Sequence, residues 1–242
     1  MGTKTFYVYD HENQAVHDAY AMLTANILIS NDQKPLKTIC ISSCSPEEGK
    51  TSLAIGVAIS MAQSGWRVLL VDADMRKPAA AKRMNQGLNV GLSNYLMGDV
   101  ELTDALSETN IRNFTYFSCG NAHPNPIELL CSTNFKILMA NVRNAYDIVI
   151  FDTPALMSVG DGAVVASNVD AALLVVRMGS TTLKCLKRVK VQLEDSNVQI
   201  LGVVLNRVKK RDYKKYFGSY NYFFNAKRFY NNIAPPQNAA KL

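Results

Sequence analysis

The chain has 242 residues, of which 48% are hydrophobic and 19% charged. This composition excludes a chain that is disordered throughout, and the length favours one α/β domain with a single sizeable core. The five cysteines are odd in number and contain no C-x-x-C pair, which favours reduced thiols over a disulfide framework or a zinc site. Reduced thiols indicate the cytosol. Because no run of about eighteen apolar residues is present, we also expect a chain that does not cross a membrane by itself.

Positive charge is concentrated near the end of the chain. The net charge is +6, while residues 207–230 hold eight lysines and arginines against a single aspartate. The remainder of the chain is therefore close to neutral. A basic segment of this kind indicates either a solvated tail or a surface for anionic lipid or nucleic acid, and charge alone leaves both open.

Short apolar runs alternate along the chain with longer amphipathic segments. Because these runs are apolar on both faces and are bounded by Gly, Asp or Asn, they predict buried strands. The expected strands are residues 37–43, 67–74, 114–120, 147–153, 171–177 and 199–206. The expected helices are residues 49–65, which stop at Gly65 as a C-cap, 127–143 and 180–196.

The alternation of strand and helix indicates the fold class. Strands joined through helices require crossover connections, which are right-handed and produce a mostly parallel sheet. We therefore expect an α/β fold with helices on both faces of the sheet. Ligands of such sheets bind at the carboxyl ends of the strands, so the functional residues are expected there.

The first expected strand runs into the segment "SSCSPEEGKTS", residues 42–52, which is followed by a helix. Its end matches the phosphate-loop pattern G-x-x-x-x-G-K-[ST], with Cys44 in place of the first glycine. Backbone N–H groups and the positive end of the helix bind phosphate, Lys50 is expected between the β- and γ-phosphates, and the Thr51 hydroxyl is expected on Mg²⁺. The expected nucleotide-binding residues of the loop are Ser45, Pro46, Glu47, Glu48, Gly49, Lys50, Thr51 and Ser52.

Three carboxylates stand at the ends of two other expected strands. Asp72 and Asp74 follow "VLLV", and Asp152 follows "IVIF". A buried, unpaired carboxylate costs several kcal/mol, roughly, so this trio requires a cation, and Mg²⁺ held with a nucleotide meets that need. The alternative is that the carboxylates cap helices or pair with Arg76 and Lys77.

Together these segments resemble the cytoplasmic kinase domain of the bacterial tyrosine kinases that regulate capsule and exopolysaccharide synthesis. The matching segments are the phosphate loop, "DADMRKP", "NPIELL", "IVIFDTP" with the downstream Asp161, and "ILGVVLN", within roughly residues 15–207. The resemblance implies a single P-loop NTPase-like domain over residues 37–207, after an N-terminal helical segment, 1–36, and before a flexible tyrosine-rich tail, 208–242.

The resemblance also implies an activity and the roles of residues. It implies an ATP- and Mg²⁺-dependent protein-tyrosine kinase with Lys50, Asp72, Asp74 and Asp152 as catalytic residues. Thr51 and Asp152 hold the metal, Asp74 steadies it through water, Asp72 resembles the carboxylate that accepts the tyrosine proton, and Asn206 stands where the family reads adenine. The implied phosphoacceptors, which a neighbouring subunit phosphorylates, are Tyr213, Tyr216, Tyr220, Tyr222 and Tyr230.

The aromatic tail supports this interpretation. Its tyrosines are spaced by Gly, Ser and Asn, as a flexible acceptor requires. Each phosphate would add about −1.5 to −2 charge, so several would cancel the positive charge of the tail. The alternatives are a final amphipathic helix or a strip that binds a membrane surface or RNA.

Partners follow from the resemblance as well. We expect a membrane-anchored activator of the polysaccharide co-polymerase type, which would recruit the chain to the inner face of the cell membrane. We also expect a cognate tyrosine phosphatase as a partner, and no binding of nucleic acid. The family's ring contact uses E-x-x-R-x-x-R, but these positions hold Asp18, Ala21 and Thr24. The ring contact is therefore not carried over, and an apolar contact through Met22, Leu23 and Ile27 is the alternative.

Two other functions stay open at this point. Partitioning ATPases of the ParA and MinD type share the fold and the three aspartates, but they carry a second lysine where this chain has Ser45. They also generally lack a terminal tyrosine cluster. The other alternative is a nucleotide-binding regulator with weak or lost kinase activity.

Overall fold

The computed structural model describes residues 5–6, 8, 14–29, 36–76, 90–209, 211–212 and 215. The strands in these residues are β1 (Thr5–Phe6), β2 (Thr38–Ser43), β3 (Val68–Asp72), β4 (Leu106–Thr109), β5 (Phe114–Phe117), β6 (Ile148–Asp152), β7 (Ala171–Arg177) and β8 (Gln199–Asn206). The helices are α1 (Gln14–Ile29), α2 (Lys50–Gln63), α4 (Leu92–Met97), α5 (Leu102–Ala105), α6 (Pro126–Leu130), α7 (Thr133–Ala145), α8 (Asp161–Ala166) and α9 (Leu183–Asp195).

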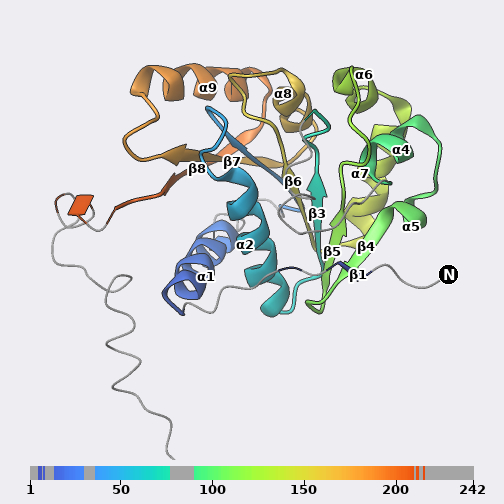
Figure 1. Ribbon diagram of the computed structural model, residues 1–242, viewed down its shortest axis with the longest axis horizontal. Helices are drawn as coiled ribbons and strands as arrows, with labels where there is room; N and C mark the ends of the chain where they lie inside the picture. Colours follow the sequence, from blue (N-terminus) through green and yellow to red (C-terminus); the bar gives the residue numbers. More distant parts are fainter. Residues whose placement is uncertain are drawn as a thin grey trace, which may run out of the picture.

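The described strands form a single sheet, in the order β1-β4-β5-β3-β6-β2-β7-β8 (Figure 1). Strands β5, β3, β6, β2, β7 and β8 pair in parallel with one another, whereas β4 runs antiparallel to β5. The α/β fold with a mostly parallel sheet is therefore confirmed. All six strands expected from the sequence are present, and β7 and β8 have the expected bounds.

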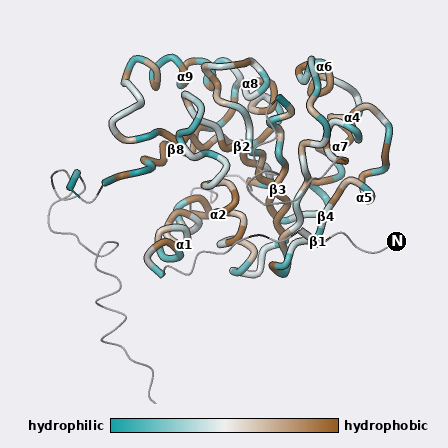
Figure 2. The backbone as a smooth tube through the Cα atoms, viewed as in Figure 1, coloured by the Kyte–Doolittle hydropathy of each residue, from teal (hydrophilic) through white to brown (hydrophobic). Residues whose placement is uncertain are grey.

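Two hydrophobic layers enclose the sheet. Along β6, Ile148 and Ile150 belong to the layer formed with α1 and α2, and Val149 and Phe151 belong to the layer formed with α7, α8 and α9. Figure 1 shows α1 and α2 together on one side of the sheet, with α8 and α9 on the other. Hydrophobic stretches follow the central strands in Figure 2. The central strands appear in the sequence as continuous apolar runs because both of their faces are buried.

The sequence and the structure differ at one helix. The sequence pattern predicts a single helix over residues 127–143, but these residues contribute to two helices, α6 and α7, with a break at Cys131 and Ser132. The Ser132 hydroxyl accepts a hydrogen bond from the backbone N–H of Phe135, at 3.2 Å, and so caps α7. A serine that satisfies a free N–H group of the first turn favours a new helix start over a continuous helix.

Helix α1 packs closely against α2. Gly56 of α2 permits this approach, since a Cβ there would lie 2.2 Å from the ring of Tyr20. The Thr24 hydroxyl donates to the Ser60 hydroxyl, at 3.1 Å, and Ile27 is buried against the core. Two residues expected as an apolar contact with another subunit, Leu23 and Ile27, therefore pack inside the chain instead. Met22 of the same set is exposed.

Within the part of the chain that the structure describes, no helix has both the length and the apolar character needed to span a membrane.

Candidate active site

The phosphate loop connects the end of β2 to the first residue of α2. Gly49 precedes the helix in the left-handed conformation, with φ of 101°, which favours a residue without a side chain. A Cβ at this position would also lie 2.1 Å from Nδ2 of Asn206. The backbone of the loop can therefore take this path only because residue 49 is glycine.

Lys50 lies between two of the predicted carboxylates. Its Nζ atom is 3.6 Å from Oδ2 of Asp74 and 3.7 Å from Oδ1 of Asp152, and it donates to the Thr51 hydroxyl at 3.4 Å. These side chains meet because β3 and β6 are neighbours in the sheet, with Asp72 and Asp152 in register. A cation and two carboxylates with little exposure thus converge at the carboxyl edge of the sheet.

Asp72 lies deeper than Asp74. Its Oδ1 accepts the backbone N–H of Asp74 at 3.1 Å, and its Oδ2 accepts the Tyr116 hydroxyl at 3.4 Å. Burial, together with the nearby charge of Asp152, raises the pKa of Asp72 to about 8. Asp72 is therefore buried at the end of β3, whereas Asp74, two residues later, lines the pocket beside the phosphate loop.

The phosphate loop is braced from the far side by Glu48 and Asn206. The buried Glu48 carboxylate accepts the backbone N–H of Ser45, at 2.9 Å, and the hydroxyl of Thr181. The Asn206 amide donates to the carbonyl of Glu48 at 2.8 Å, and its oxygen accepts the backbone N–H of Arg207 at 2.8 Å. Both polar atoms of Asn206, expected at the adenine ring, thus bond to the protein backbone in this structure.

A pocket of about 360 Å³ opens above this arrangement. It brings together the predicted residues Pro46, Glu47, Gly49, Lys50, Thr51 and Asp74. The remaining predicted residues do not line it; these are Ser45, Glu48, Ser52, Asp72, Asp152 and Asn206. The five predicted phosphoacceptor tyrosines lie outside the described residues.

The pocket also contains Arg76, which lies in the segment "DADMRKP" but is not among the predicted site residues. Its guanidinium makes two hydrogen bonds to the Asp161 carboxylate, at 2.7 and 3.0 Å, and Asp161 is fully buried at the start of α8. In the sequence, Arg76 is the alternative partner of Asp72 and Asp74. The distant Asp161 forms the hydrogen-bonded ion pair with Arg76, and the charge of Asp74 also acts on this guanidinium. Only the fold brings Arg76 and Asp161 together.

The donor set fits a magnesium nucleotide. The hydroxyl of Thr51 and the carboxylates of Asp74 and Asp152 are hard oxygen donors, which Mg²⁺ prefers. In the described residues, no group of three or more His, Cys, Asp or Glu side chains could hold a metal ion. Mg²⁺ at nucleotide sites is usually bound through one or two carboxylates and the phosphates, and Thr51, Asp74 and Asp152 are donors suited to that mode.

Comparison with known proteins identifies the family. Residues 36–200 match the family described as AAA domain. The tyrosine-protein kinase CpsD of Streptococcus pneumoniae is 35% identical over 190 residues, which cover 78% of this chain and 83% of CpsD. YwqD of Bacillus subtilis, another tyrosine-protein kinase, is 32% identical over 82% of this chain and 84% of its own length. The chain belongs to the bacterial tyrosine-protein kinases.

Solved structures agree with this assignment of the kinase. The chimerical protein CapA2B2 superposes with a TM-score of 0.78 at 29% identity, covering 86% of this kinase and 95% of that chain. The kinase domain of Escherichia coli ETK gives a TM-score of 0.77 at 33% identity, covering 81% of this kinase and 76% of that chain. The septum site-determining protein MinD of Pyrococcus horikoshii, at 24% identity and a TM-score of 0.61, shares the fold.

Proposed function

We propose that this protein-tyrosine kinase phosphorylates the tyrosines of its own C-terminal segment, between copies of the chain, and so regulates capsule or exopolysaccharide biosynthesis. The observation that carries the proposal is the position of Lys50, whose ammonium group lies within 4 Å of Asp74 and Asp152 beside the phosphate loop. A cation and oxygen ligands converging on one open pocket suit phosphoryl transfer, in which charge stabilisation and positioning are the main contributions.

Each residue of the site has a proposed role. ATP with Mg²⁺ supplies the phosphoryl group. Lys50 binds the phosphates, Thr51 and Asp152 bind the metal directly, and Asp74 steadies it through water. As the acceptor phenol oxygen bonds to the γ-phosphorus, the bond to ADP breaks and the phenolic proton leaves, and Asp72 is the proposed acceptor of that proton.

The loop residues position these groups. The N–H groups of residues 45–52 bind the phosphates, with Ser45, Pro46, Glu47, Glu48 and Ser52 as the flanking members of the loop. Glu48 and Asn206 hold the loop in shape through their hydrogen bonds to Ser45 and to the Glu48 carbonyl. For Asn206, contact with the adenine ring stays part of the proposal.

The rest of the chain has proposed roles too. The N-terminal segment, 1–36, contributes α1, which packs on the kinase domain, 37–207, and residues 208–242 are the proposed acceptor tail. A membrane-anchored activator of the polysaccharide co-polymerase type would hold the kinase at the inner face of the cell membrane. A cognate tyrosine phosphatase would reverse the reaction. The relatives support this proposal because they are tyrosine-protein kinases that this chain matches over most of their length.

Replacement of Lys50 tests the proposal. In Lys50→Met the ammonium group that meets the phosphates is removed, so we expect phosphate incorporation into residues 211–232 to fall by about a hundredfold or more. Mass spectrometry of the full-length chain after incubation with Mg-ATP, with and without an activator, measures it. Lys190→Met is the matched control, because Lys190 pairs with the exposed Glu194 of its own helix, at 2.6 Å, and does not line the catalytic pocket. Tail phosphorylation at the wild-type rate in Lys50→Met would refute the proposed function.

A further inference from the structure

A second pocket, of about 450 Å³, lies between the loop that follows β6 and the helix α9. Ser158 and Val159 line both this pocket and the catalytic pocket. The two pockets are therefore neighbours on the same loop. A volume in the range of roughly 300 to 1,000 Å³ is typical of sites that bind a ligand, so this pocket can hold one or two side chains of a peptide.

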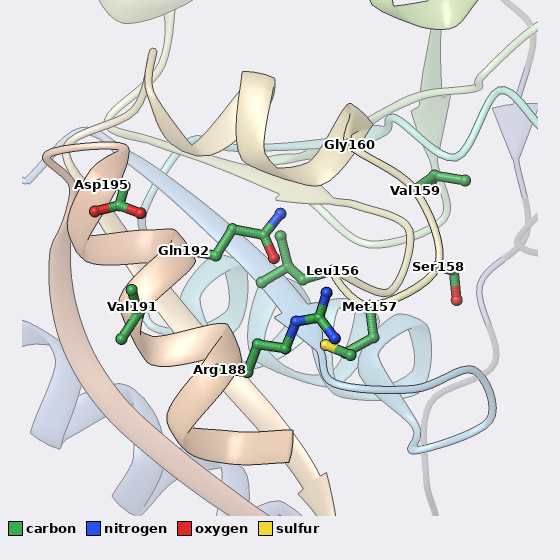
Figure 3. Close-up of a pocket in the computed structure, with 9 residues that line it drawn as sticks. All are labelled: Leu156, Met157, Ser158, Val159, Gly160, Arg188, Val191, Gln192 and Asp195. Carbon is green, nitrogen blue, oxygen red and sulfur yellow. The ribbon is translucent and has the colours of Figure 1, made fainter. Parts of the chain in front are cut away.

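The second pocket is lined by both apolar and polar groups. Leu156, Met157, Val159 and Val191 supply its apolar surface, and Ser158 together with Arg188, Gln192 and Asp195 of α9 supplies its polar surface. Leu156 is buried at its base, and Met157 and Val191 are exposed by 37% and 54%. Figure 3 shows Arg188 and Gln192 reaching from α9 toward Leu156 and Met157. Aliphatic and thioether surface beside a guanidinium group suits an aromatic ring. The ring packs against the aliphatic groups and the thioether, and its face attracts the guanidinium cation.

The tail of the chain carries a matching pattern. Three of its five predicted acceptor tyrosines have a phenylalanine as a direct neighbour; the pairs are Tyr216 with Phe217, Tyr222 with Phe223, and Phe229 with Tyr230. Lys214 and Lys215 precede the first pair, and the exposed Asp195 at the pocket provides an anion for them. Tyr213 and Tyr220 have no aromatic neighbour.

We infer that the second pocket is the acceptor subsite of the kinase and binds the phenylalanine next to the tyrosine in the catalytic pocket. The inference rests on the proposed function, because it requires the tail of another copy to be the acceptor. It assigns specificity to Met157 and Val191, two residues outside the catalytic pocket. Its consequence is an order of reaction, in which Tyr216, Tyr222 and Tyr230 are phosphorylated before Tyr213 and Tyr220.

A peptide with the sequence of residues 214–219, KKYFGS, and its Phe217→Ala form test the subsite as acceptors for the full-length kinase with Mg-ATP. We expect Phe217→Ala to raise the peptide KM about tenfold, the effect of losing part of the burial of one aromatic ring. The enzyme variants Met157→Ala and Val191→Lys should raise the KM for KKYFGS by a similar factor and leave the KM for the alanine peptide nearly unchanged. Fluorescence anisotropy of a labelled peptide carrying Tyr216→Phe measures binding without turnover.

Val203→Lys is the matched control, since Val203 is an exposed valine of β8, at 48%, that lines neither pocket. The subsite is refuted if tail and peptide are phosphorylated but Met157→Ala and Val191→Lys behave like Val203→Lys. It is also refuted if these variants impair only stimulation by a membrane activator, because the pocket would then serve that partner. No phosphate on any tail tyrosine of the wild-type chain would overturn the proposed function and the subsite together.

Discussion

At the scale of single residues, Gly49 is the residue of the phosphate loop at which we expect a substitution to be least tolerated. Its φ of 101° strains any other residue, and a Cβ would collide with the Asn206 amide that braces the loop. We therefore expect Gly49→Ala to lower the free energy of unfolding by about 2 kcal/mol and to weaken ATP binding at least tenfold.

Urea unfolding and titration calorimetry with ATP measure these two effects. Gly179→Ala separates the two causes, because Gly179 also has a positive φ, 76°, but nothing lies within 4 Å of its Cβ position. This control should lose about 1 kcal/mol of stability and keep its ATP affinity. Equal ATP affinities in the two variants would show that the contact with Asn206 does not shape the loop.

The sequence was sufficient for the residues that local motifs define. A glycine before Lys50 at a strand-to-helix turn, together with aspartates at the ends of apolar strands, rarely arises by chance, and the fold brings Lys50, Asp74 and Asp152 together. The ion pair of Arg76 with Asp161 could not be found in the same way. Its two members are 85 residues apart, and nothing in either segment names the other.

At the scale of secondary structure, the partly buried carboxylate of Asp170 joins three elements. It accepts hydrogen bonds from the backbone N–H groups of Lys37 and Thr38 at the start of β2, at 2.9 and 2.8 Å, and from Arg143 of α7. Burial opposes ionisation of this carboxyl, but the Lys37 N–H, the Arg143 guanidinium and the Thr38 groups outweigh it and hold the pKa of Asp170 below its ordinary value.

We expect Asp170→Asn to lower the free energy of unfolding by about 2 kcal/mol at pH 7, the usual loss for a charged hydrogen-bonded group. Since the folded-state pKa is depressed, this stabilisation is complete above the ordinary Asp pKa of about 3.9 and disappears as the pH falls through the lower folded-state value. Urea unfolding at pH 7, 4 and 3, roughly spanning that range, measures it. Asp147→Asn, at an exposed pair with Arg67, is the control with a smaller loss. A difference between wild type and Asp170→Asn that does not shrink in acid would contradict this account.

The elements themselves were predictable where both faces of a strand are buried. Such strands are short apolar runs, and the runs at 171–177 and 199–206 have the observed bounds. Strand β4, "LSET", was missed because three of its four residues are polar and only Ser107 is buried, so it forms no apolar run. The break before α7 depends on the capping hydroxyl of Ser132, and the spacing of apolar residues along the sequence does not reveal such a cap.

At the scale of the whole molecule, the structure bears on how two copies meet. Of the positions that carry the family's ring motif, Thr24 is buried and bonded to Ser60 of the same chain, and Ala21 is exposed without a charge. With alanine and threonine in place of both arginines, these positions lack the cations of the ring contact. Phosphorylation of one tail by another copy would then depend on encounter in solution or on an activator that gathers the copies.

Mixing two variants tests this dependence. One carries Lys50→Met with an intact tail, and the other has an intact site but phenylalanine in place of the five tail tyrosines. We expect phosphate on the Lys50→Met chain, at an initial rate that rises about fourfold when both concentrations are doubled, because the transfer is bimolecular. Mass spectrometry after incubation with Mg-ATP measures it. If the Lys50→Met chain in the mixture gains no phosphate, under conditions where the wild-type chain by itself is phosphorylated, the transfer takes place within one chain. A rate proportional to the first power of concentration would indicate a preformed assembly with a contact other than the ring motif, because in stable complexes the effective concentration of the acceptor is fixed by geometry.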